Sequence, residues 1–330
     1  MTTMKALIID PSTSRMVLGE HPKPEPGPQD LLVKINATAL NRADLLQKAG
    51  KYPVPEGESP ILGLEMSGVV EAVGDRVEAF SPGEAVFGLL PGGGYAEYCV
   101  IPEGMAIPKP ESLSFEEAAA IPEVFLTAWQ ALIWEGRIID NETVLIHAGA
   151  SGVGTAAIQL AKQLFGATVI TTASRQEKLD LCRTLGADLT INYQSDDFPQ
   201  VIGKELGGNH LNLVIDFVGS PYWEKNIDVM AMDGRMVILS MLGGATVEKM
   251  SLVPILRKRL TICGSTLRNR SKPYKEELTR SFWYKSREHL EQGTIRPVID
   301  SVYSWKEVEK AHQRMKDNEN AGKIILRVEP

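Results

Sequence analysis

Short apolar runs separated by turn residues dominate the first part of the chain. Runs such as LLVKINATAL, MSGVVEAVG, EAVFGLL and YAEYCVIP are broken by the turn signals PKPEPGPQD, SPGE and PGGG. Short strands at this spacing between Gly- and Pro-rich turns are typical of β-sandwiches and barrels. The pattern therefore predicts a β-rich, partly closed barrel over residues 1–122.

From about residue 123 the pattern changes to strands that alternate with helices. Helical spacing marks EVFLTAWQALIW, then TAAIQLAKQLF, which Gly166 ends, and RQEKLDLCRTLG, which ends at Gly186. Near-continuous Val, Ile and Leu mark six strands, in ETVLIHA, ATVITTA, DLTINY, LNLVIDFVG, GRMVILSM and LTICGST. Strands that are apolar on both faces fit a covered parallel sheet. The predicted fold class is α/β, with a doubly wound, six-stranded parallel sheet of the Rossmann type.

The last part of the chain is too short to enclose a core of its own. It contains a helical stretch, YKEELTRSFWYKSREHLEQG, a second helical pattern, KEVEKAHQRMKDNEN, and a final strand-like run, GKIILRVEP. We therefore expect the tail to pack on the N-terminal domain. The expected domains are 1–122 plus 269–330, which is β-rich and catalytic, and 123–268, which binds a dinucleotide.

Composition narrows the classes of partner. The 330 residues are 43% apolar and carry a net charge of −7, which argues against nucleic acid or an anionic membrane as the partner. We see no signal-peptide pattern and no apolar stretch near the roughly 20 residues of a membrane helix, so we expect a cytoplasmic protein. Cysteines and histidines are too scattered for a disulfide framework or a metal site. They are Cys99, Cys182, Cys263, His21, His147, His210, His289 and His312.

A Gly-rich turn lies between the first predicted strand of the sheet and its helix. The usual dinucleotide fingerprint is G-x-G-x-x-G, and here a serine replaces the middle glycine, in HAGASGVGTAAIQLAK. The strand-turn-helix context favours a phosphate site over a plain small-residue turn, because a helix N-terminus offers free N–H groups to a pyrophosphate. The expected phosphate-binding residues are Gly149, Ser151, Gly152, Val153 and Gly154.

The end of the next strand indicates which dinucleotide binds. NAD-binding units usually place an acid there for the ribose 2′-OH, whereas this chain has Ser174 and Arg175, with Lys178 one helical turn later and Glu177 nearby. A hydroxyl and two cations favour the 2′-phosphate of NADPH; the alternative is a solvated basic start of a helix. Tyr193 is expected to contact the adenosine phosphate, unless it is an ordinary buried strand tyrosine.

The whole chain resembles the medium-chain dehydrogenase/reductase superfamily, and within it the quinone oxidoreductase branch related to zeta-crystallin. The resemblance rests on long stretches: ALNRADLLQKAGKYP, LGLEMSGVV, LLPGGGYAEY, AAAIPEVFLTAWQAL, VLIHAGASGVGTAAIQLAK, YWEKNIDVMAMDGRMV and NAGKIIL. It implies a GroES-like fold for the β-rich domain.

The same resemblance shows which metal ligands are missing. Zinc alcohol dehydrogenases of this superfamily have a Cys where this chain has Asn41 and a His where it has Leu64, and they carry a lobe with four close cysteines that is absent here. Asp44 and Glu65 supply oxygen but have no Cys or His beside them, although a catalytic zinc needs three ligands. We expect no metal.

The resemblance implies an acceptor site in a cleft between the domains, lined by Asn41, Asp44 and Tyr52. Asn41 would bond the substrate oxygen or the nicotinamide ribose, and Tyr52 would gate the cleft, stack on the acceptor or donate a hydrogen bond. Asp44 would orient its neighbours or cap the following helix. For all three, an ordinary turn, cap or loop role stays open.

Further cofactor contacts follow from the matching segments. Thr127, Met241, Leu242, Gly243, Leu267 and Arg268 would lie near the nicotinamide, Val218 and Gly219 near the adenosine, and Lys323 near the phosphates. For such loop residues, a role in turning the chain or in packing is about as common as a contact with a cofactor.

Three functions remain open at this point. The first is a metal-free, NADPH-dependent quinone oxidoreductase, in which the cofactor supplies the hydride and the protein supplies position and electrostatics. The second is a reductase of an alkenal, enone or enoyl-thioester, for which Arg257, Lys258, Arg259, Arg268 and Arg270 are the basic candidates. The third is a non-catalytic NADPH-binding sensor or structural protein. We also expect a homodimer, because the sixth strand would leave an open sheet edge.

Overall fold

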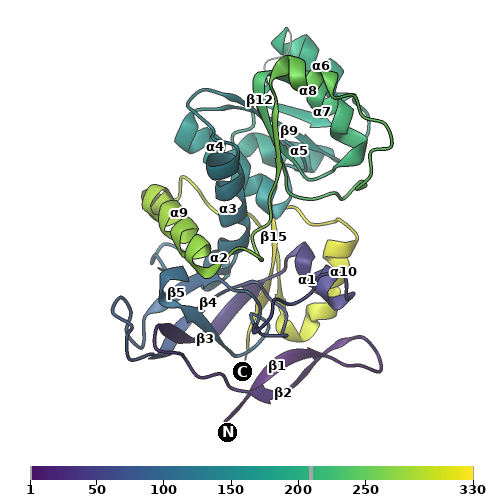
Figure 1. Cartoon of the computed structure of the whole chain (residues 1–330). Helices are drawn as coiled ribbons and strands as arrows, with labels where there is room; N and C mark the ends of the chain where they lie inside the picture. Colours follow the sequence, from purple (N-terminus) through teal and green to yellow (C-terminus); the bar gives the residue numbers. More distant parts are fainter. Residues whose placement is uncertain (1, 208–210, 330) are drawn as a thin grey trace. The chain divides into compact units, whose positions relative to one another are not determined.

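The computed structural model describes residues 2–207 and 211–329, so His210 lies outside the described residues. The chain forms two compact units, one of Met1–Leu126 with Arg268–Pro330 and the other of Thr127–Leu267 (Figure 1). We call them the discontinuous unit and the central unit. The sequence predicts domain boundaries near residues 122 and 268. That these segments are separate domains stays a prediction.

The central unit contains six parallel strands in the order β10-β9-β8-β11-β12-β13, as predicted. The strands are β8 (Thr143–Ile146), β9 (Thr168–Ala173), β10 (Leu189–Asn192), β11 (Leu211–Asp216), β12 (Met230–Ile238) and β13 (Thr261–Gly264). Its helices are α4 (Gly152–Phe165), α5 (Gln176–Thr184), α6 (Phe198–Leu206), α7 (Trp223–Val229) and α8 (Val253–Lys258). The strand order reverses direction between β8 and β11, the place where ligands bind in such sheets.

Apolar strands and precise helix ends explain this sheet. Leu145, Ile170 and Val214 are fully buried in its core, as continuous aliphatic runs predict. Helix α4 ends at Gly166, whose φ of 57° lies in the left-handed region that glycine adopts without strain. The predicted stop is therefore confirmed. Helix α3 (Pro122–Trp129) runs through the boundary between the two units and continues as a π-helical turn, Gln130–Glu135.

The discontinuous unit is built on mostly antiparallel strands, with β14 and β15 paired in parallel. A seven-stranded sheet has the order β14-β15-β3-β4-β5-β7, with β6 also paired to β3, and β1 pairs with β2 separately. Its strands are β1 (Thr3–Ile9), β2 (Met16–Pro22), β3 (Asp30–Ala39), β4 (Glu65–Val73), β5 (Ala85–Leu89), β6 (Tyr98–Pro102), β7 (Ala106–Pro108), β14 (Ile299–Ser304) and β15 (Lys323–Arg327). Its helices are α1 (Arg42–Lys48), α2 (Phe115–Ala119), α9 (Lys272–Gln292) and α10 (Val308–Lys316).

The C-terminal tail joins the N-terminal sheet by strand pairing. β15 runs antiparallel to β3, with Ile325 opposite Ala39, and both residues are fully buried. This pairing brings Lys323, at the start of β15, near the end of β3. Within residues 2–207 and 211–329, no helix is long and apolar enough to span a membrane.

Candidate functional site

The Gly-rich turn of the central unit has the geometry of an anion site. Ser151 is the N-cap of α4, and its Oγ accepts a hydrogen bond from the backbone N–H of Gly154 at 3.0 Å. The first-turn N–H groups of Gly152 and Val153 have no acceptor inside the helix, by helix geometry. Ala148 adopts a φ of 50°, which is costly for a residue other than glycine and is typical of functional turns. This turn can therefore present N–H groups and the positive end of the helix dipole to a phosphate.

Two glycines of the turn are required by close packing. A Cβ atom at Gly149 would overlap Oγ1 of Thr171 on β9, and one at Gly154 would overlap the carbonyl oxygens of Ala148 and Gly149. Helix α4 therefore lies directly against the turn, and the turn lies directly against β9. The serine that interrupts the usual glycine pattern caps the helix instead.

Other predicted cofactor residues of this unit follow the carboxyl ends of the parallel strands, so they lie at the same end of the sheet. After β9, Ser174 is half-buried and Arg175, the N-cap of α5, is exposed. Tyr193 follows β10, and its N–H donates to the carbonyl of Ala173 at 3.2 Å. The Tyr193 side chain is 45% exposed, so its reading as a buried strand tyrosine is wrong.

Two loops at the same end of the sheet are bonded to each other. Gly243 N–H donates to the carbonyl of Val218 at 2.8 Å, and Leu242 N–H to that of Phe217. Asp216, at the end of β11, is fully buried and accepts the N–H groups of Val218 and Gly219 at 2.7 and 3.2 Å. Sequence reasoning did not identify this role, because an aspartate that ends a strand is also common in plain turns.

Asp216 should make stability depend on pH. Burial raises its pKa from 3.8 to about 6, although the two N–H groups oppose the rise. The folded state then holds this proton over the range in which the unfolded state has lost it, so stability falls as pH rises from about 4 through 6. We expect Asp216→Asn to gain up to about 3 kcal/mol relative to wild type between pH 4 and pH 7. Urea unfolding at several pH values measures this, with the exposed Asp228→Asn as control; parallel curves for Asp216→Asn and wild type would contradict it.

The discontinuous unit contains a buried polar cluster that includes two of its three predicted catalytic residues. Asn41 Nδ2 donates to Glu65 Oε1 at 2.8 Å, and Lys323 Nζ donates to Asn41 Oδ1 at 2.7 Å. Lys323 Nζ also pairs with Glu65 Oε1 at 2.7 Å and donates to the carbonyl of Leu40. Lys323 was expected at the cofactor phosphates, but it is 3% exposed and its donors face this cluster. The Glu65 carboxylate attracts this ammonium, and a place for Lys323 at the cofactor phosphates stays a prediction.

Asp44 acts as a structural acceptor in the same cluster. One carboxylate oxygen accepts the backbone N–H of Asn41 at 2.7 Å, as a capping residue does, and the other accepts that of Gly63. The Tyr95 hydroxyl donates to Asp44 at 3.2 Å and also lies 3.2 Å from His312 Nε2. Burial raises the pKa of Asp44 to about 6. The capping alternative is therefore present, and a catalytic role for Asp44 stays a prediction.

Tyr52 lies in the discontinuous unit with a different set of neighbours. Its half-buried ring is 5.2 Å from the guanidinium carbon of Arg268, and Arg268 Nε donates to the carbonyl of Pro91 at 3.0 Å.

Glu123, the second residue of α3, is a buried acid that sequence reasoning missed, because an acid in the first turn of a helix is ordinary. Burial, and then the charge of Glu65, raises its pKa to about 8. Electrostatic coupling to Tyr52 places Glu123 in the same region.

The remaining predicted residues lie at the ends of the central unit. Thr127, in α3, is half-buried and Leu267 is 5% exposed. They are the first and last residues of the central unit, whereas Arg268 belongs to the discontinuous unit. Their expected place beside the nicotinamide stays a prediction.

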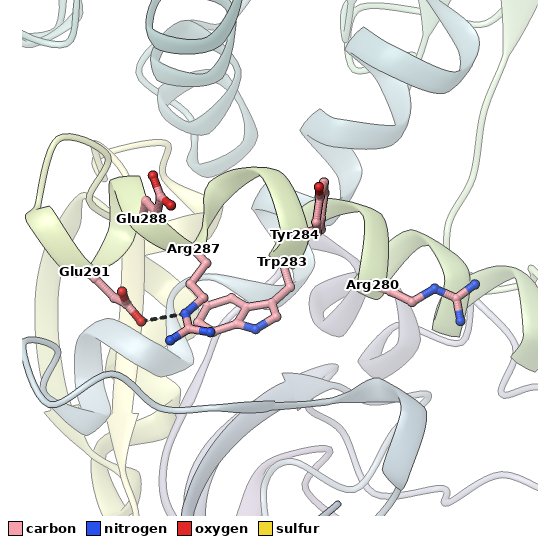
Figure 2. Close-up of a pocket in the computed structure, with 6 residues that line it drawn as sticks. All are labelled: Arg280, Trp283, Tyr284, Arg287, Glu288 and Glu291. Atoms are coloured by element: carbon pink, nitrogen blue, oxygen red, sulfur yellow. Dashed lines mark hydrogen bonds and ion pairs between the residues drawn. The ribbon is translucent and has the colours of Figure 1, made fainter.

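Helix α9 carries a surface hollow that contains none of the predicted site residues. Figure 2 shows Trp283, Arg287 and Glu291 along this helix, with Arg287 paired to Glu291. All residues of this hollow come from one helix, and Tyr284 is 81% exposed. Within the described parts of the chain, no group of three or more His, Cys, Asp or Glu side chains is placed to hold a metal ion.

Comparison with known proteins agrees with this geometry. A family model described as zinc-binding dehydrogenase matches residues 152–282, and one described as alcohol dehydrogenase GroES-like domain matches residues 27–111. The chain is 28% identical to a quinone oxidoreductase of Homo sapiens over 92% of this chain and 90% of that protein. It is 32% identical to a 2-methylene-furan-3-one reductase of Solanum lycopersicum, over 90% of this chain and 71% of that protein.

A solved structure extends the likeness to the whole backbone. A mycobacterial protein in complex with NADPH superposes with a TM-score of 0.85 at 26% identity, covering 99% of this chain and 100% of that chain. The predicted Rossmann and GroES-like folds are therefore confirmed. The chain belongs to the quinone oxidoreductase branch of the medium-chain dehydrogenase/reductase superfamily of oxidoreductases.

Proposed function

We propose that this protein is an NADPH-dependent quinone oxidoreductase that transfers hydride without a metal. One observation carries the choice of cofactor: an exposed arginine, Arg175, follows β9 where NAD-binding units place a carboxylate. Glu177 lies in the first turn of the helix and is exposed as well. A cationic side chain beside a hydroxyl suits a 2′-phosphate. The NADPH complex of the mycobacterial relative supports the same choice.

The residues of the central unit fit a bound dinucleotide. The N–H groups at the start of α4 would hold the pyrophosphate, and Ser174, Arg175 and Lys178 would hold the 2′-phosphate. Tyr193 would lie against the adenosine, and the two bonded loops, at Val218 and at Met241–Gly243, would line the remainder. Bound there, NADPH would supply the hydride, and the protein would supply position and electrostatics.

The acceptor side of the proposal rests on the discontinuous unit. Asn41 is held between Glu65 and Lys323, so this donor set presents an amide and an ammonium rather than the thiolate and imidazole of a zinc site. The human relative is named a quinone oxidoreductase. A planar quinone needs only hydride and a proton from water. The tomato relative, an enone reductase by its name, keeps an alkenal, enone or enoyl-thioester acceptor as the second candidate.

The test is NADPH oxidation by the purified protein over ortho- and para-quinones and enones, with NADH as the control cofactor. Quinone turnover that prefers NADPH is the expected result. Turnover of enones alone would replace the acceptor, and tight NADPH binding without turnover on any acceptor would favour the sensor or structural role.

Arg175→Ala should reduce the preference for NADPH over NADH. We expect the ratio of kcat/KM values to fall about 10- to 100-fold, since a hydrogen bond between charged groups contributes about 1.5–3 kcal/mol. Arg183→Ala on the same helix, where Arg183 pairs with Asp180, removes the same charge and should leave the ratio unchanged. An unaltered ratio in Arg175→Ala would remove the basis for the choice of NADPH.

A homodimer is part of the proposal. Among the residues that the structure describes, β13 pairs only with β12 and forms one edge of the central sheet. A second copy would cover this edge by strand pairing. Light scattering coupled to size exclusion should give twice the chain mass of 36.2 kDa; a single 36 kDa species would contradict the dimer.

A further inference from the structure

Arg268 is a buried cation with unused hydrogen-bond donors. The residue is 4% exposed, and its Nε donates to the carbonyl of Pro91. Nη1 and Nη2 have no hydrogen-bond partner anywhere in the described chain, and no carboxylate there lies within ion-pair distance of the group. Buried guanidinium groups are normally bonded to carboxylates, carbonyls or a ligand. The two free nitrogens therefore point to a partner that the protein itself does not supply.

The neighbours of Arg268 leave its charge uncompensated. Lys275 Nζ donates to the carbonyl of Arg268 at 2.6 Å and adds a second cation. Two acids act in this region, and neither forms an ion pair with Arg268. Glu58 lines the nearby cavity and interacts electrostatically with Lys275, and burial and the charge of Glu65 raise the pKa of Glu123 to about 8. The Tyr52 ring, 5.2 Å from the guanidinium carbon, is the stabilising contact that remains.

A cavity lies near the Arg268 guanidinium, and the Tyr52 ring beside it belongs to an irregular segment. Pro91 and Lys275, the two residues hydrogen-bonded to Arg268, also line a cavity of about 550 Å³ in the discontinuous unit. Tyr52 belongs to a segment between α1 and β4 that has neither helix nor strand, and its neighbours Lys51 and Pro53 are exposed. Such a segment can move a side chain without breaking regular structure.

We propose that Arg268 binds the reducible oxygen of the acceptor through Nη1 and Nη2, and that Tyr52 covers the guanidinium until the acceptor displaces it. The inference rests on the proposed function and names the group that contacts the acceptor. With NADPH bound, hydride transfer would oxidise the dihydronicotinamide and reduce the acceptor: a C–H bond would break on the dihydronicotinamide, the hydride would form a new bond to the acceptor, and the π electron pair displaced within the acceptor would leave a negative charge on its oxygen. The guanidinium stabilises that oxygen until it takes a proton from water.

A phenolate probe tests the binding step without turnover. 4-Nitrophenol resembles the reduced acceptor, and its visible absorption reports its ionised form. We expect the wild-type full-length protein to bind the phenolate and to lower the apparent pKa of the probe. In Arg268→Gln, affinity for the phenolate should fall at least about tenfold, with Arg268→Lys in between. Arg280→Gln, which removes an exposed arginine of α9, is the charge control. Superposable titrations of wild type and Arg268→Gln would overturn the proposal.

Kinetics give a second, independent readout. With a quinone acceptor, Arg268→Gln should lower kcat by about 100-fold, as loss of one oxyanion donor does elsewhere, while the Kd for NADPH changes less than about threefold. An unchanged kcat in Arg268→Gln would overturn the proposal. If wild type reduces no quinone, the proposed function fails, while the phenolate titration still tests Arg268 as an oxyanion site.

Discussion

Lys323→Met is expected to lower the free energy of unfolding by about 3–5 kcal/mol, because it leaves the Glu65 carboxylate buried without its cation. Glu65 is 0% exposed and Lys323 is 3% exposed. The lost ammonium donates to the carbonyl of Leu40, to Asn41 Oδ1 and to Glu65 Oε1, each at 2.7 Å. Chemical denaturation of the full chain measures the effect.

Two further variants separate this cause from a general loss of packing. The double variant Glu65→Gln/Lys323→Met removes both charges and should be more stable than Lys323→Met alone, since no unpaired charge remains. Lys310→Met, at a lysine whose side chain is 73% exposed, should change stability by less than about 0.5 kcal/mol. A double variant less stable than the Lys323→Met single variant would show that the pair does not act as described.

Gly154→Val is expected to raise the Kd for NADPH about 100-fold or more, equivalent to about 3 kcal/mol of binding free energy. A Cβ at this position would overlap the carbonyl oxygens of Ala148 and Gly149. Helix α4 must then move away from the turn, and the N–H groups of Gly152 and Val153 move with it. The loss therefore falls on the groups proposed to hold the pyrophosphate. Isothermal titration with NADPH measures it.

The matched control is another helical glycine of the central unit. A Cβ at Gly203, in α6, meets no atom within 4 Å, so Gly203→Val introduces the same side chain without overlap. It should bind NADPH with wild-type affinity. Equal affinity in both variants would remove the Gly-rich turn from the cofactor site.

The sequence predicted those features that depend on local pattern. Continuous aliphatic runs predicted the parallel sheet, and the Gly-rich turn predicted a helix N-terminus that the structure places beside β9. Gly166 ended α4 as expected because its φ of 57° suits glycine. In each case a few neighbouring residues determine the geometry.

Contacts between residues that lie far apart in the chain could not be predicted from a single sequence. Lys323 and Glu65 meet only because β15 pairs with β3, and hydrophobic periodicity reports burial but not the identity of a partner. Sequence reasoning therefore did not identify Glu65 as a partner of Lys323, and the place of Lys323 at the cofactor phosphates stays a prediction. Tyr193 is exposed for a similar reason: it lies just beyond the last paired residue of its strand.

The pairing of β15 with β3 also orders events during synthesis. The polar cluster around Asn41 and Glu65 is complete only when the last strand of the chain has been made, because Lys323 begins that strand. The central unit, Thr127–Leu267, is one continuous segment and can fold as it leaves the ribosome, as contiguous domains generally do. Until β15 has been synthesised, the N-terminal part of the discontinuous unit therefore holds the Glu65 carboxylate without its ammonium partner.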